Sequence, residues 1–102
     1  MYVVYGSVEL FLPYCLSLKE KRKIIHGLIT RIRKRFNVSI SEVAFHDLWQ
    51  RTALGFSAVS HNSPELELII NSVKQTFLDY SSDTEMTVFD YDIINYPNTH
   101  FL

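Results

Sequence analysis

The sequence has little of several residue types, and each shortage excludes a class of protein. A single cysteine, Cys15, makes an intrachain disulfide impossible, so we expect a cytoplasmic chain that does not depend on an oxidising compartment. Three glycines and three prolines in 102 residues exclude collagen-like and low-complexity chains. No apolar run approaches the ~20 residues of a membrane-spanning helix. With 47% hydrophobic residues, the composition predicts one globular domain.

Motifs for metal binding and catalysis are also missing. Cys15 has no CxxC partner, and no nucleophile elbow or glycine-rich loop frames a serine. We therefore expect Cys15 to be a packed residue, and Asp90 and Asp92 to lie on a solvated strand face. Nothing predicts a metal, a cofactor or an enzymatic activity. The four histidines have no ligand spacing such as HxxxH; they are His26, His46, His61 and His100.

The net charge of −1 conceals a strong segregation of charge along the chain. Residues 1–16 carry only Glu9. Residues 17–36 carry eight cations against Glu20, a net charge of +7, whereas residues 37–102 carry two cations against nine acids, a net charge of −7. Because electrostatic fields at a protein surface are set locally, within a Debye length of ~10 Å, the basic segment is a candidate for binding a polyanion.

Hydrophobic periodicity predicts a strand and then a helix in the first third of the chain. Residues 4–12 have apolar even positions, which predicts a strand that Pro13 ends. A capping box from Ser17 to Glu20 begins an amphipathic helix that ends near Asn37. Its apolar stripe consists of Leu18, Ile25, Leu28, Ile29, Ile32 and Phe36.

The rest of the chain predicts two strands, a helix and a last strand. Residues 38–45 and 52–60 alternate, and a phase change near Ser41 and Glu42 indicates a β-bulge in the first of them. Asn62 and Pro64 begin the second helix, and residues 86–94 form the last strand. The stripe of the second helix consists of Leu66, Ile69, Ile70, Val73 and Phe77.

The predicted order β-α-β-β-α-β indicates an α+β fold, the ferredoxin-like plait. With right-handed crossovers, both helices cover one face of a four-stranded antiparallel sheet. Residues 1–96 are expected to form this single domain, and residues 97–102 a short tail. The other face of the sheet is then bare in a monomer.

Several sequence blocks resemble the YlxP-like family of small bacterial proteins (domain of unknown function 503), over residues 2 to about 95. The resemblance implies a ferredoxin-like fold. Many members are encoded beside transcription-elongation, translation-initiation and ribosome-maturation genes, which implies a connection with RNA or the ribosome. The sequence departs from the family at Phe45-His46 and after Asn95. The matching blocks are Leu12-Pro13, Ser17-Leu18-Lys19-Glu20-Lys21-Arg22, Arg35-Phe36-Asn37-Val38-Ser39, Asp47-Leu48-Trp49-Gln50-Arg51 and Leu54-Gly55.

The basic helix is the predicted functional surface. We expect it to contact the RNA backbone, with ribosomal RNA as the expected target, because lysine and arginine displace the counterions of phosphates. The alternatives are a module that docks an acidic protein partner and, more weakly, a regulatory domain that binds a metabolite. The predicted RNA contacts are Lys19, Lys21, Arg22, Lys23, Arg31, Arg33, Lys34 and Arg35.

Exposed aromatic residues predict a further contact surface. Tyr5, Phe11, Phe89 and Tyr91 are assigned to the bare sheet face, where a homodimer interface is favoured over base stacking. Trp49 is expected to close the end of the core, and the alternative is a binding hot spot. Arg51 beside it is expected to stack or to pair with an acid.

Overall fold

A computed structural model describes residues 1–80 and 82–101, apart from the side chain of His100. The elements follow the predicted β-α-β-β-α-β order, with a short 3-10 helix, η1, added near the end of the chain. Their bounds are β1 (Tyr2–Phe11), α1 (Leu18–Arg35), β2 (Ser39–Ala44), β3 (Arg51–Ser60), α2 (Ser63–Asp79), β4 (Glu85–Asn95) and η1 (Asn98–Phe101).

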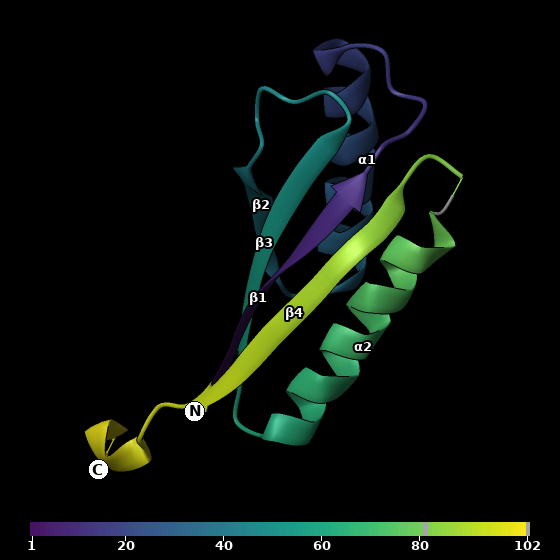
Figure 1. Cartoon of the computed structure of the whole chain (residues 1–102). Helices are drawn as coiled ribbons and strands as arrows, with labels where there is room; N and C mark the ends of the chain where they lie inside the picture. The colour runs from purple at the N-terminus through teal and green to yellow at the C-terminus, as the bar shows by residue number, and fades with distance from the viewer. Residues whose placement is uncertain (81, 102) are drawn as a thin grey trace.

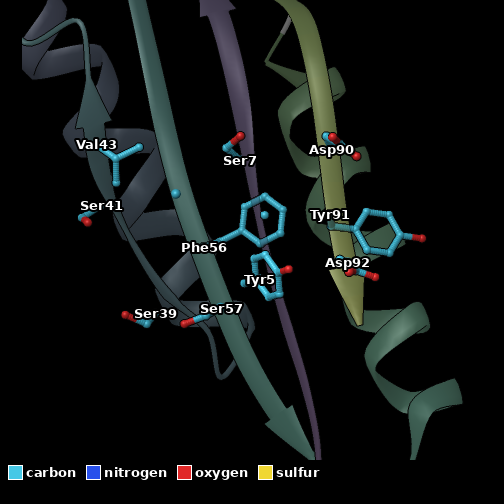
Figure 2. A pocket seen from close by; sticks show the side chains of 12 residues that line it. Tyr5, Ser7, Ser39, Ser41, Val43, Phe56, Ser57, Asp90, Tyr91 and Asp92 are labelled. Atoms are coloured by element: carbon cyan, nitrogen blue, oxygen red, sulfur yellow. The ribbon is translucent and has the colours of Figure 1, made fainter. Parts of the chain in front are cut away.

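The four strands form one antiparallel sheet in the order β2-β3-β1-β4, with β1 and β3 in the centre (Figure 1). This arrangement confirms the ferredoxin-like plait. The strands β2 and β4 are the two edges. Small side chains occupy much of the sheet face that the helices leave open (Figure 2).

Side-chain caps fix where each helix begins. The Ser17 hydroxyl accepts a hydrogen bond from the Glu20 amide (3.1 Å), and the Glu20 carboxylate accepts one from the Leu16 amide (2.7 Å). The predicted capping box is therefore present, with the glutamate reaching one residue further back than in the usual form. In α2, the Asn62 side chain accepts from the Glu65 amide (2.8 Å).

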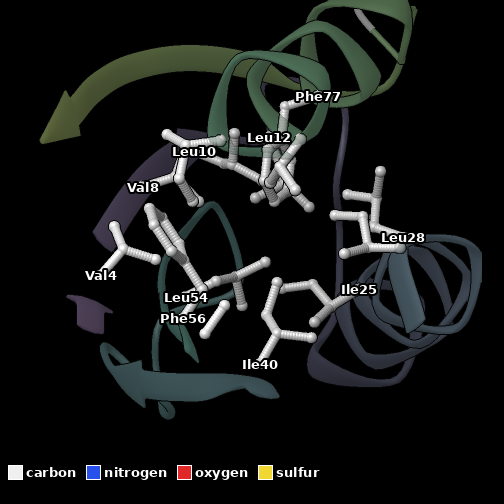
Figure 3. Packing of buried hydrophobic residues seen from close by; sticks show 14 of the residues in the cluster. Val4, Val8, Leu10, Leu12, Ile25, Leu28, Ile40, Leu54, Phe56 and Phe77 are labelled. Carbon is white, nitrogen blue, oxygen red and sulfur yellow. The ribbon is translucent and has the colours of Figure 1, made fainter. Parts of the chain in front are cut away.

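The hydrophobic core lies between the sheet and both helices (Figure 3). Even-numbered residues of β1 pack against the stripe of each helix, as the periodicity predicts, and Cys15 is buried at the end of the sheet. Leu28 of α1 and Ile70 of α2 are completely buried. The core thus fixes which face of α1 remains in solvent.

The strand β2 ends in an irregular turn. Its register with β3 shifts between Glu42 and Ala44, one or two residues beyond the predicted bulge. Phe45 then adopts a left-handed conformation with φ of 63°, which is uncommon for a residue other than glycine. This turn directs residues 45–50 back toward the beginning of α1.

The end of the chain leaves the sheet after β4. The N-terminal amine of Met1 donates to the Tyr96 carbonyl (3.2 Å), which joins the two ends of the chain beside the last strand. The 3-10 helix η1 projects away from the sheet (Figure 1). Within the described residues, no helix is both long and apolar enough to span a bilayer.

Candidate nucleic-acid interface

Seven of the eight predicted RNA contacts are exposed on α1. The one acid of the helix, Glu20, is engaged in the cap at its first turn. We call these seven side chains the basic face: Lys19, Arg22, Lys23, Arg31, Arg33, Lys34 and Arg35.

None of the seven cations has a carboxylate partner among the described residues. Three arginines instead lie against neutral groups. Arg33 donates to the Ile40 carbonyl of β2 (2.7 Å), Arg31 lies over the Tyr80 ring (4.8 Å) and Arg35 over the Phe36 ring (5.2 Å). The lysines Lys19 and Lys23 have no such contact with any residue that the structure describes, so the basic face keeps its charge available to a partner.

The eighth residue, Lys21, was wrongly assigned to this surface. Its side chain is turned inward and is 1% exposed. Its ammonium donates to the carbonyl oxygens of Phe45 and Leu48, each at 2.6 Å, and lies 3.0 Å from a carboxylate oxygen of Glu42. Lys21 therefore connects α1 to the β2–β3 loop and cannot contact RNA. Two of the blocks that carry the family resemblance, residues 17–22 and 47–51, meet at this lysine.

Glu42 is the acidic partner of Lys21, and we call this pair with its loop carbonyls the internal site. Partial burial raises the pKa of Glu42, but hydrogen bonds from Thr52 and Lys21 and the positive charges of Lys21 and His46 outweigh burial. The net effect holds the pKa of the Glu42 carboxyl below its usual value. The carboxylate is thus ionised at neutral pH and compensates the buried ammonium.

A glycine interrupts the basic face near the middle of α1. Gly27 is exposed, and a Cβ built there would meet nothing within 4 Å. The missing side chain leaves a shallow hollow of about 360 Å³ lined by His26, Thr30, Arg31 and Lys34. Backbone of another molecule could therefore approach this helix closely between positive side chains.

The loops beside the beginning of α1 expose large apolar side chains. Trp49 is 51% exposed, so the expectation that it closes the core is wrong; buried Leu12 and Cys15 already fill that position. The Gln50 side chain donates to the carbonyls of Pro13 (3.4 Å) and Cys15 (3.3 Å), which joins the β1–α1 and β2–β3 loops. We call the exposed large apolar side chains of the two loops the loop-end patch: Tyr14, Leu16, Leu48 and Trp49.

The prediction that Arg51 stacks or pairs with an acid is confirmed in both respects. Its guanidinium lies 3.8 Å above the Phe45 ring and forms an ion pair with Glu9 (3.1 Å). The Arg51 side chain on the open sheet face is therefore already engaged by Glu9 and Phe45.

The four aromatic residues of the predicted dimer interface do not share one face. Tyr5 and Phe11 are exposed on the open face of the sheet, as expected. Phe89 and Tyr91 lie on the opposite face, because they pair with Val8 and Gly6 in register. Phe89 stacks on Phe56 with centroids 5.4 Å apart, and the Tyr91 hydroxyl donates to Glu67 of α2 (2.8 Å).

The open face instead carries the two aspartates of β4. Asp90 and Asp92 are exposed there, opposite Ser7 and Tyr5, which confirms that they lie on a solvated strand face. They border a shallow hollow of about 800 Å³ whose lining also includes Ser41 and Val43 (Figure 2). Negative charge on this face disfavours RNA. Within the described residues, no three His, Cys, Asp or Glu side chains are grouped as metal ligands.

Comparisons with known proteins agree with the sequence blocks. A relative, "Uncharacterized protein YlxP" of Bacillus subtilis (strain 168), is 42% identical over 72 residues, which are 71% of this chain and 77% of the relative. A solved structure, "Structure of the REP associates tyrosine transposase bound to a REP hairpin", has a TM-score of 0.50 at 11% identity. The match covers 97% of this chain but only 59% of that chain, and it concerns the fold alone. The family model "Protein of unknown function (DUF503)" matches residues 3–92, and the chain therefore belongs to the DUF503 family.

Proposed function

We propose that the chain is a non-enzymatic RNA-associated protein that contacts the RNA backbone, with ribosomal RNA as the expected target, through the basic face of α1. One observation carries the proposal: seven exposed cations on one helix have no carboxylate partner among the described residues. The like charges of such a surface repel one another. Binding an RNA backbone lowers the free energy, because the cations displace the counterions of the phosphates.

The position of the lysines along α1 supports a binding role over a structural one. Arg33, Lys34 and Arg35 are in the last turn, where positive charge interacts favourably with the helix dipole. Lys19 is in the first turn, where the same dipole makes positive charge unfavourable, and Lys23 lies one turn further on, where the dipole no longer stabilises it. The helix dipole therefore does not favour these two lysines, whereas a polyanionic ligand would be attracted by them.

Gly27 is a second feature that the fold alone does not explain. An exposed glycine inside a helix costs about 1 kcal/mol relative to alanine, and nothing in the described structure needs the space above Gly27. The hollow over it lies between His26, Arg31 and Lys34. A phosphate approaching the helix there would be surrounded by positive charge.

Charge reversal tests the proposal. The variant Lys19→Glu/Lys23→Glu/Lys34→Glu should lose binding to a structured RNA while remaining folded, with an unchanged circular dichroism spectrum and a cooperative melt, because all three side chains are exposed. The control is Lys74→Glu on α2, which removes a lysine from another surface and should bind as the unmodified chain does. Equal binding by the triple variant and the control would exclude the basic face as an RNA site.

A second candidate is a module that docks an acidic protein. The loop-end patch favours it, because Tyr14 and Leu16 are 79% and 71% exposed beside the beginning of the basic helix. Exposed aromatic and apolar residues that adjoin cations are typical of protein contacts. Pull-down from a bacterial lysate with and without ribonuclease distinguishes the candidates: loss of partners after ribonuclease favours RNA, and their retention favours an acidic protein.

A further inference from the structure

The outer edge of β4 is the longest unpaired edge in the described structure. β4 pairs with β1 on one side, over Glu85–Asn95, and no strand of the described residues lies on its other side (Figure 1). From Val88 to Asn95 its register with β1 is unbroken. Backbone N–H and C=O groups along such an edge are free to pair with another strand.

The two edges of the sheet differ in how well they are protected against pairing with another strand. The opposite edge, β2, has only six residues and is interrupted by a bulge, both of which discourage pairing. β4 has 11 residues and contains no lysine, arginine or proline. The charged groups in its paired middle are Asp90 and Asp92, which alternate on the open face and have no cationic partner among the described residues.

A second copy of the chain fits this edge poorly. When two β4 strands pair antiparallel over their full length, Glu85 lies opposite Asn95, and Asp90 therefore lies opposite Asp90 of the other copy. Like charges directly opposite each other destabilise a strand pair. The two aspartates thus act against self-association and favour a strand of opposite charge.

We propose that the outer edge of β4 binds an extended segment of a partner protein that has lysine or arginine at alternate positions. The segment adds a fifth strand, and its backbone pairs with the edge. Its basic side chains lie on the open face, where Asp90 and Asp92 border the hollow that contains Ser7. The residues of the segment that alternate with these basic ones lie on the other face, toward half-buried Tyr91 and Ile93, and are therefore apolar.

One local contact would be exchanged on binding. The Asp92 carboxylate accepts a hydrogen bond from the Ile93 amide (2.9 Å). In the complex, a carbonyl of the added strand takes this N–H, and the Asp92 carboxylate turns to the incoming cation. The exchange leaves every polar group of the pair satisfied. It requires no RNA, so the proposal does not depend on the function of α1.

The test uses the full chain and two fluorescent nine-residue peptides of equal composition. One alternates lysine and valine, and the other has the lysines and valines in two blocks. We expect the alternating peptide to bind about tenfold more tightly than the block peptide, and Asp90→Asn/Asp92→Asn to lose about tenfold in affinity for it. The control, Asp47→Asn/Asp83→Asn, removes the same charge from exposed loop positions outside β4 and should bind normally.

Equal affinity for the two peptides, or unchanged binding by Asp90→Asn/Asp92→Asn, would overturn the proposal. Two alternating peptides N-methylated at even or at odd positions give a test that needs no protein variant. Only one of them should lose binding, because alternate residues of a strand present their amides to opposite sides. If both bind like the unmodified peptide, the edge is not used. Dimerisation of Asp90→Asn/Asp92→Asn without a peptide preference would assign the edge to a second copy and also overturn the proposal.

Discussion

The buried ammonium of Lys21 lies 3.0 Å from the Glu42 carboxylate and donates to three backbone carbonyls of the β2–β3 loop, those of Phe45, His46 and Leu48. One side chain therefore fixes the position of this loop against α1. Because α1 also carries the basic face, Lys21 connects that helix to the loop that contributes Leu48 and Trp49 to the loop-end patch. It is a positioning residue, although its charge initially suggests an RNA contact.

Replacing Lys21 with methionine should destabilise the fold by about 2–4 kcal/mol, because it removes the buried ammonium that pairs with Glu42 and donates to three loop carbonyls. Urea unfolding of Lys21→Met measures this change. Lys23→Met is the matched control, since Lys23 is exposed on the same helix and its loss should change stability by less than about 0.5 kcal/mol. Equal unfolding midpoints for the two variants would show that the internal site contributes nothing.

The low pKa of Glu42 predicts a specific pH dependence. A carboxyl whose pKa is lower in the folded state contributes stability above its unfolded pKa, and the contribution is lost as pH falls through the folded pKa. The unfolding free energy of the unmodified chain should therefore exceed that of Glu42→Gln at neutral pH, and the difference should shrink below about pH 4.5. A difference that stays constant from pH 7 to pH 3 would contradict this role.

Leu28→Ala should cost about 2–5 kcal/mol, because it removes methylenes from a completely buried position between α1 and the sheet. Leu68→Ala is the control, since Leu68 lies on α2 and is largely exposed. Thermal unfolding of both variants checks the orientation of the helices. Comparable losses in the two variants would mean that α1 does not present Leu28 to the core.

Gly27→Ala should separate stability from function. Alanine should raise the unfolding free energy by about 0.5–1 kcal/mol, because it is the better helix former and meets no neighbour. If RNA approaches the helix at this point, the same variant should bind RNA more weakly. A variant that is more stable and binds equally well would show that the hollow over Gly27 is not part of the interface.

Periodicity, together with caps and prolines, was sufficient to predict the four strands, the two α-helices and their order, but not η1. The capping box at Ser17, the bulge in β2 and the buried stripe of α1 are each set by a few neighbouring residues. Once these elements are known, the handedness of the crossovers leaves few ways to arrange them. The fold was therefore accessible from the sequence.

The side-chain roles that depend on contacts between elements were harder to predict. Lys21 follows the core spacing of Ile25 and Leu28, so the stripe extended backward would have pointed it inward. Its partners, however, are backbone carbonyls of a distant loop, which no sequence pattern shows. In β4, Asp90 and Asp92 alternate with Phe89 and Tyr91, and this order was the available signal that the aromatic residues face the core.

The position of Trp49 could not be read from composition or spacing. A tryptophan in a short loop can pack inward or outward, and the outcome depends on what already fills the end of the core. Here Leu12 and Cys15 occupy that position, and hydrogen bonds from Gln50 fix the loop around them. Trp49 is consequently left in solvent.

The salt dependence of RNA binding tests the central claim most directly. A titration of the full chain with a structured RNA at several salt concentrations should give a log–log slope of about −0.7 to −0.9 for each phosphate contacted. Lys19→Glu/Lys23→Glu/Lys34→Glu should bind far more weakly and with a slope shallower by about two to three, one phosphate for each lysine lost. If the unmodified chain does not bind at low salt, or if both proteins bind with the same affinity and slope, α1 is not an RNA-binding surface.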